Sequence, residues 1–127
     1  MFEDFDLIHS YTRKQAIEDG VLADVSEMAK EAGFKIPVAI TNEVLSDLIV
    51  PNKDMERYGQ SIDGRLWDTL IVLFFEIKNM ADENYLLFKV LYLMDVNKEP
   101  ELKELKAIIS GGDNGEPVIT IMYKHED

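Results

Sequence analysis

The chain has no cysteine among its 127 residues, and it has only two histidines and one tryptophan. Without cysteine it cannot form a disulfide, a thiolate metal site or a cysteine nucleophile. The absence fits a protein of a reducing cytosol.

Long apolar runs are also missing, since the longest one spans only residues 70–75. A helix needs about 20 apolar residues to cross a bilayer. The N-terminal segment carries Glu3, Asp4 and Asp6, so it is acidic where a secretory signal is basic and then apolar. We expect a cytoplasmic protein that has no membrane partner.

Basic side chains are scarce: 13 Lys and Arg stand against 25 Asp and Glu, and the formal net charge is −12. The acids are spread along the whole length, so a compact domain of this size carries a broad negative field. Such a field repels nucleic acid and membrane surfaces and attracts basic protein surfaces. Because the lysines and arginines are scattered, we expect no direct DNA binding.

Hydrophobic residues make up 46% of the chain, which predicts a folded core despite the charge. This length is most simply one domain, residues 1–127. Short strands and helices alternate over residues 1–50, and a polar loop follows over residues 51–60. The expected helices lie at 13–19, at 27–32 and after Thr41, with Thr12, Ser26 and Thr41 as N-caps. The expected strands lie at 21–25 and 37–40, and the second is placed at a sheet edge because it begins with proline.

A long helix is predicted over residues 62–80, since Leu66, Leu70 and Leu73 fall at helical spacing. Three antiparallel strands follow, at 85–94, 102–110 and 117–123, and Asn114-Gly115 marks the tip of the last hairpin. The first of these strands is apolar on nearly both faces, which predicts a central or doubly covered strand and leaves open a homodimer. We expect an α+β domain in which an antiparallel sheet, with this C-terminal meander, packs against one long central helix and shorter N-terminal helices.

One candidate catalytic group is formed by His9, Tyr11 and Arg13. A functional interpretation makes His9 a general base and Arg13 an anion clamp. The simpler interpretation is a strand edge that runs into a helix cap, because one histidine with no fixed partner is weak evidence for catalysis. We favour the simpler interpretation and predict no catalytic residue. His125 lies close to the C-terminus and is not expected to act as a ligand or base.

The turn that holds Asp113 and Glu116 could offer oxygen ligands to Ca²⁺ or Mg²⁺. It lacks the spacing of a calcium loop, and two carboxylates alone hold neither ion well. It also lacks the lysine of a phosphate-binding loop. A hairpin turn is a sufficient explanation, so we predict no metal site and no cofactor.

At the start of the long helix, Arg65 is expected to form a surface ion pair with Asp63 or Asp68. Trp67 is interpreted as a core residue, because its neighbours are apolar. If part of its indole ring is exposed, Trp67 becomes the leading candidate for a partner anchor.

The acidic side chains could be only a soluble surface, or they could imitate a phosphate backbone and compete for a nucleic-acid channel. Three clusters suit the second role. Their members are Glu3, Asp4 and Asp6; Glu18, Asp19, Asp24, Glu27 and Glu31; and Glu99, Glu101 and Glu104.

Several segments resemble a family of small acidic proteins of unknown function. They are residues 8–13, 15–22, 24–26, 31–34, 64–68 and 112–120, and residues 51–60 match least. The family is similar to genes on bacterial plasmids, integrative elements and phages. The resemblance implies a bacterial host and a role in the survival or transfer of such an element. It implies no catalytic residues.

Charge and resemblance together suggest a stoichiometric, non-enzymatic inhibitor of a basic host defence nuclease, an anti-CRISPR-like protein whose partner is a CRISPR effector. One alternative is an accessory protein of plasmid maintenance or conjugation. Another is an enzyme acting on a nucleotide or nucleic acid through His9, Tyr11 and Arg13. The sequence leaves the partner, the binding surface and the oligomeric state open.

Overall fold

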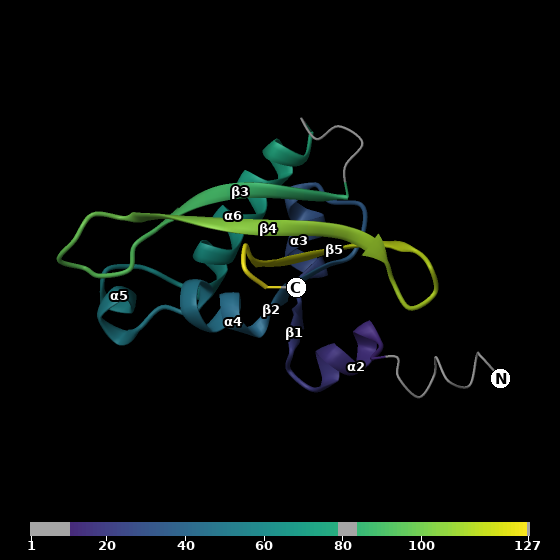
Figure 1. The fold of residues 1–127 in the computed structure, drawn as a ribbon. Helices are drawn as coiled ribbons and strands as arrows, with labels where there is room; N and C mark the ends of the chain where they lie inside the picture. Colours follow the sequence, from purple (N-terminus) through teal and green to yellow (C-terminus); the bar gives the residue numbers. More distant parts are fainter. Residues whose placement is uncertain (1–10, 79–83, 127) are drawn as a thin grey trace.

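The computed structural model describes residues 11–78 and 84–126, which form one five-stranded sheet with helices on its faces (Figure 1). The strand order is β1-β2-β5-β4-β3. The strands are β1 (Leu22–Asp24), β2 (Val38–Thr41), β3 (Tyr85–Tyr92), β4 (Glu101–Gly111) and β5 (Pro117–Tyr123). The predicted α+β class is confirmed, and so is the antiparallel meander of β3, β4 and β5.

The sheet is mixed and not wholly antiparallel, because β2 runs parallel to β5. β2 is also not the edge strand that we expected, since it lies between β1 and β5 and its residues are buried. Pro37 precedes the first strand residue, so its missing N–H removes no ladder bond. Its carbonyl accepts a hydrogen bond from the amide of Ile119 at 2.9 Å and extends the pairing with β5.

β3 differs in the opposite way: we expected a central or doubly covered strand, and among the described residues it is an edge strand, paired only with β4. Exposure alternates along it. Phe88, Val90 and Tyr92 are buried under the helices, whereas Tyr85, Leu87, Lys89 and Leu91 are exposed on the other face. The near-continuous apolar pattern therefore does not reflect burial on both sides.

Several helices begin where a capping side chain accepts an amide hydrogen. Thr12 caps α2 (Arg13–Glu18), and Thr41 caps α4 (Asn42–Val44), which continues into a π-helical turn, η1 (Leu45–Ile49). Ser26 is not the predicted cap. It is the first residue of α3 (Ser26–Ala32), and its hydroxyl accepts from the amide of Val38 at 3.0 Å, tying α3 to β2.

The segment predicted as a polar loop contains a short helix, α5 (Lys53–Arg57), whose first turn is capped by Asn52. The long helix α6 (Ile62–Ile77) begins at the predicted position, and Ser61 caps its first turn. The end predicted for it, at residue 80, lies outside the described residues. In the described part of the chain, none of the helices has the length and apolar character needed to span a bilayer.

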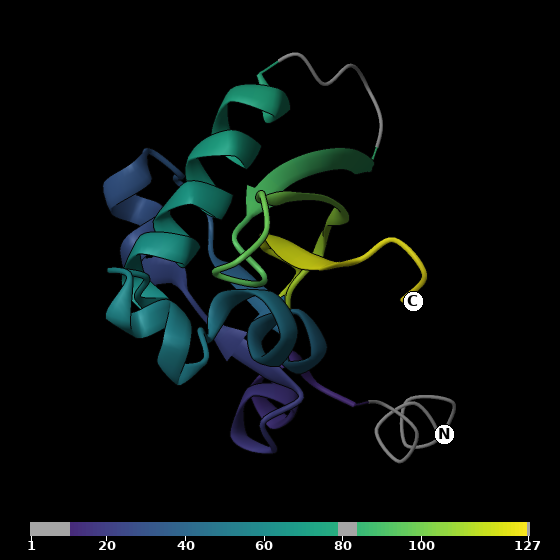
Figure 2. The same cartoon turned by 90° about the vertical axis from the view of Figure 1, so that its left-hand side faces the viewer.

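Figure 2 shows α3 and α6 on one face of the sheet, and this layer holds the core. Leu70 and Leu73 of α6 are fully buried against Leu105, Ile119 and Ile121 of the sheet. The predicted role of α6 as the centre of the core is thus confirmed. On the opposite face, which we call the open face, α2 lies beside β1 and the β4–β5 hairpin; within residues 11–78 and 84–126, no helix packs on the part of this face formed by β3 and β4.

Candidate functional site

Two segments that are far apart in the sequence meet where α2 reaches the β4–β5 hairpin. The backbone amide of Arg13 donates to Oδ1 of Asp113 at 2.8 Å, and the amide of Lys14 donates to Oδ2 at 3.0 Å. A carboxylate thereby accepts from the free amides of the first helical turn, where negative charge is stabilising. We call this contact the α2–hairpin junction.

The side chain of Arg13 is part of the same junction and holds α2 to β5. Its guanidinium donates to Oγ1 of Thr120 and to the carbonyl of Ile119, both at 2.7 Å. Desolvation lowers the pKa of Arg13, while the nearby carboxylates of Asp24, Asp113 and Glu116 act in the opposite direction. Arg13 stays charged, and both terminal nitrogens of its guanidinium donate to β5, so the fork of an anion clamp is already engaged by the fold.

The other two members of the predicted catalytic group do not complete a site. Tyr11 is 55% exposed, and its hydroxyl donates to Asp19 at 2.7 Å. That hydrogen bond, more than desolvation or charge, raises the pKa of Tyr11. His9 lies outside the described residues.

A cleft of about 450 Å³ lies between α2 and the open face of the sheet, and Tyr11, Ala16, Leu22, Thr120 and Met122 are among its lining residues. The described residues contain no group of three or more histidine or acidic side chains that could hold a metal ion. Asp113 is engaged by α2, and Oε1 of Glu116 accepts from the amide of Asn114 at 2.9 Å. The hairpin prediction for this turn is confirmed, and Gly115 has the positive φ of 82° that the turn requires.

The predicted acidic clusters do not form one surface. Glu18 and Asp24 come together with Asp113 and Glu116 around a groove of about 360 Å³ that Arg13 and Lys14 also line, and because acids outnumber bases there we call it the acidic groove. Glu27 and Glu31 lie exposed on α3. Asp19 accepts from Tyr11, and Asp24 also accepts from the hydroxyl of Ser26 at 2.6 Å.

The third cluster lies toward the opposite end of the sheet, around the β3–β4 connection (Figure 1). Two of its members are neutralised locally, because Glu101 pairs with Lys103 at 3.1 Å and Glu104 with Lys124 at 3.2 Å. The first cluster, Glu3, Asp4 and Asp6, lies outside the described residues.

Two predictions at the start of α6 are wrong. Arg65 is not a surface residue: it is 3% exposed and donates to the carbonyl of Leu48 at 2.7 Å and to that of Leu93 at 2.8 Å. Trp67 is not in the core, since 39% of it is exposed. The cause is helical geometry, because the buried face is set by Leu66, Leu70 and Leu73, and Trp67 falls to the side of it.

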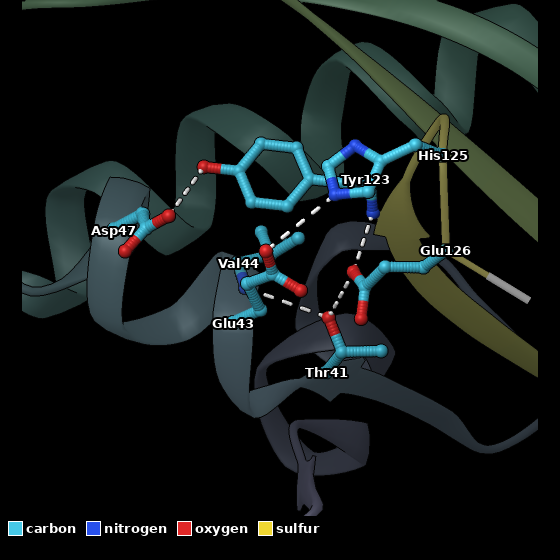
Figure 3. A network of polar contacts seen from close by, with 7 residues as sticks. All are labelled: Thr41, Glu43, Val44, Asp47, Tyr123, His125 and Glu126. Carbon is cyan, nitrogen blue, oxygen red and sulfur yellow. Dashed lines mark hydrogen bonds and ion pairs between the residues drawn. The ribbon is translucent and has the colours of Figure 1, made fainter.

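A polar network at the C-terminal end of the chain was missed by sequence reasoning (Figure 3). Glu126 accepts from the hydroxyl of Thr41 and from the amide of Tyr123, both at 2.8 Å. The ring of His125 stacks on Tyr123 at 5.2 Å and its Nε2 lies 3.5 Å from Glu43. Tyr123 donates to Asp47 at 3.1 Å; burial and this hydrogen bond raise its pKa.

The model of a family of unknown function, DUF6573, matches residues 1–127. The chain belongs to this family. No curated protein matches the chain, and no solved structure does. The DUF6573 match spans both segments of the α2–hairpin junction, and these are also segments that carried the resemblance noted in the sequence. The junction joins residues of this DUF6573 chain, Arg13 and Asp113, that are 100 positions apart in the sequence.

Proposed function

We propose that this protein is a stoichiometric inhibitor that binds a basic, nucleic-acid-targeting defence nuclease of a bacterial host, in the manner of an anti-CRISPR protein. One observation carries the proposal: in a chain of net charge −12, the structure gathers Glu18, Asp24 and Glu116 around the acidic groove. These carboxylates come from α2, β1 and the β4–β5 hairpin. Rigid elements therefore present them together to a partner.

The chemistry of such a partner follows from the charge. Arginine and lysine side chains that line a guide or target channel are the groups that a cluster of carboxylates attracts most strongly. Acidic residues that occupy this channel compete with the phosphate backbone, and no catalytic step is needed. The commitment of Arg13 to Thr120 and Ile119 supports a binding role in preference to an enzyme that uses Arg13.

The test uses a CRISPR effector loaded with its guide, mixed with the tagged chain at low and high salt. We expect a complex that weakens as salt screens the attraction. Target cleavage by the effector should stop at a ratio near one chain per effector. Recovery of replication or transfer proteins from a bacterial lysate, without the effector, would instead favour an accessory protein of plasmid maintenance or conjugation.

Two triple variants separate local from total charge, because both change the net charge by the same amount. One neutralises the three carboxylates that carry the proposal, Glu18→Gln, Asp24→Asn and Glu116→Gln, and keeps the oxygens that accept from Ser26 and Asn114. The control neutralises Glu56→Gln, Asp63→Asn and Glu76→Gln, which lie outside every predicted cluster. We expect the first variant to weaken binding ~10-fold or more and the control to change it by less than ~3-fold. An affinity that changes neither with salt nor in the first variant would contradict the proposal.

A further inference from the structure

The free edge of the sheet offers a row of unpaired backbone groups. The amide of Ile109 donates to the carbonyl of Asn84 at 2.7 Å, so Asn84 points its backbone groups toward β4. Backbone direction alternates along a strand, and the N–H and C=O groups of Tyr85, Leu87, Lys89 and Leu91 therefore point away from β4. Within residues 11–78 and 84–126, no strand pairs with that side of β3.

Apolar side chains surround this edge on both sides. On α6, Trp67 is 39% and Phe75 is 60% exposed, and on the open face of the sheet Leu91 and Leu102 are 60% and 57% exposed. A groove beside β3 joins the two sides, since Trp67, Ile71, Val72, Leu91 and Leu102 are among its lining residues. We call the outward edge of β3, this groove and the exposed apolar side chains beside them the β3 edge surface. Two views show the last turns of α6 reaching past β3 on its free side, beside the place where a further strand would lie (Figures 1 and 2).

Exposed edges with apolar flanks are rare in monomers, because they promote pairing with other chains. Charged residues usually protect them, and here β3 has one, Lys89. The exposed parts of Tyr85, Leu87, Leu91, Leu102, Trp67 and Phe75 amount to on the order of 600 Å², against roughly 800 Å² that each partner buries in a standard interface.

We propose that a second copy of this chain covers the β3 edge surface, with β3 of one copy paired antiparallel to β3 of the other about a two-fold axis. The charges of the surface favour a like partner. β3 has no acidic residue in a chain of net charge −12. If Phe88 lies on the axis, Lys89 faces Leu87 and Tyr85 faces Leu91, so that no like charges are opposed.

The two-fold axis also makes the α6 helices complementary. It sets them antiparallel, so the N-terminal half of one helix, which includes Asp68, lies toward the C-terminal end of the other, where Lys78 is the C-cap. Their exposed apolar side chains, including Phe75, then cover each other and flank the paired strands. A closed symmetric pair of this kind uses up both free edges and stops further growth.

The inference is independent of the proposed inhibitor function, and salt distinguishes the two. Two copies of the same acidic chain repel each other, so screening by salt should strengthen self-association. The complex with a basic partner should weaken under the same change. Failure of one proposal therefore leaves the other standing.

The experiment is sedimentation velocity of the full chain over a concentration series, at low and high salt. We expect a species of twice the 14.6 kDa chain mass that grows with concentration and with salt. Hydrogen exchange of the unmodified chain gives a second readout. The amides of Tyr85, Leu87, Lys89 and Leu91 should gain protection as the concentration rises.

A double variant, Phe75→Lys with Leu91→Lys, tests the surface, and a folding check by circular dichroism accompanies it. The matched control is Val21→Lys with Tyr58→Lys, two residues that are 50% and 69% exposed and do not belong to the β3 edge surface. We expect the first pair to weaken dimerisation ~30-fold or more and the control to change it by less than ~3-fold. A chain that stays monomeric at every concentration and salt would overturn the inference. A dimer whose affinity is unchanged by Phe75→Lys with Leu91→Lys would also overturn it. The same holds for a dimer in which the four amides stay unprotected, and for assembly beyond two copies.

Discussion

The backbone amide of Arg13 lies 2.8 Å from Oδ1 of Asp113, and this contact joins the first described helix to a hairpin near the other end of the chain. The other oxygen of the Asp113 carboxylate accepts from the amide of Lys14, so Asp113 serves two amides of the first turn as a capping side chain would. α2 has only six residues and is too short to be stable alone. Its position therefore depends on contacts with the rest of the domain, of which this is one.

Replacing Asp113 with alanine should lower the free energy of unfolding by about 1–2 kcal/mol, because the two amides lose an anionic acceptor at a helix start. Urea denaturation measures this loss. The amides of Arg13 and Lys14 should exchange faster with solvent in the variant. The control is Asp54→Ala, an exposed residue paired with Arg57, which should cost about 0.5 kcal/mol. Equal costs for the two variants would show that Asp113 does not hold α2.

Arg65 connects three parts of the chain, since it donates to Leu48, to Gln60 and to Leu93. Its guanidinium also lies 5.4 Å from the centre of the Tyr92 ring. Arg65→Met leaves two backbone carbonyls without this donor and should cost about 2–4 kcal/mol of unfolding free energy. Arg57→Met, at an exposed position, should cost less than about 0.5 kcal/mol. Urea denaturation measures both costs. If Arg65→Met lowers the free energy of unfolding only slightly, water takes over the hydrogen bonds of the guanidinium.

Gly33 ends α3 with φ 116°, and a β-carbon there would lie 2.8 Å from the ring of Phe74. Gly33→Ala should therefore combine backbone strain with a clash and cost about 2–4 kcal/mol. Gly20→Ala is the matched control, because Gly20 also has a positive φ, 78°, but no atom within 4 Å of the added carbon. It should cost only about 1 kcal/mol, from strain alone. Thermal unfolding of the two variants separates the clash from the strain.

Alkaline pH should destabilise the protein through Tyr92. Burial raises the pKa of its hydroxyl from 10.0 to about 12, against smaller opposing effects of Thr69 and Arg65. Because the folded pKa is raised, its stabilising contribution is complete below pH 10 and is lost as pH rises toward 12. The loss should reach roughly 2–3 kcal/mol by pH 12. Denaturation between pH 9 and 12 measures it, and Tyr92→Phe should flatten the curve. An unchanged slope in Tyr92→Phe would assign the effect to other groups.

Local features of the fold could be predicted where neighbouring residues decide them. Thr12 and Thr41 cap helices as predicted, because their hydroxyls reach amides only three residues away. Asn114-Gly115 forms the turn of the last hairpin, which adjacent residues also decide. The spacing of Leu66, Leu70 and Leu73 identifies the buried face of α6.

The candidate site was predicted less well, because its partners are distant in sequence. Glu18 and Asp24 were placed in one acidic cluster, but the contributions of Asp113 and Glu116 to the acidic groove come from a hairpin some 90 residues later. Arg13 was considered as an anion clamp, and only the approach of β5 shows that Thr120 and Ile119 occupy its donors. Nothing in the spacing of Thr41, Tyr123 and Glu126 indicates that the carboxylate of Glu126 accepts from the Thr41 hydroxyl and the Tyr123 amide.

The sequence by itself determined the charge of −12, the α+β class, the antiparallel meander and the central apolar helix, because composition and periodicity act over a few neighbouring residues. Only the tertiary structure decided that β2 runs parallel to β5, that Arg65 is buried and that β3 is left at a free edge. A strand with two apolar faces is equally suited to the centre of a sheet or to an edge that another chain covers. Which of these it becomes depends on the order in which distant strands pair, and local pattern does not contain that order.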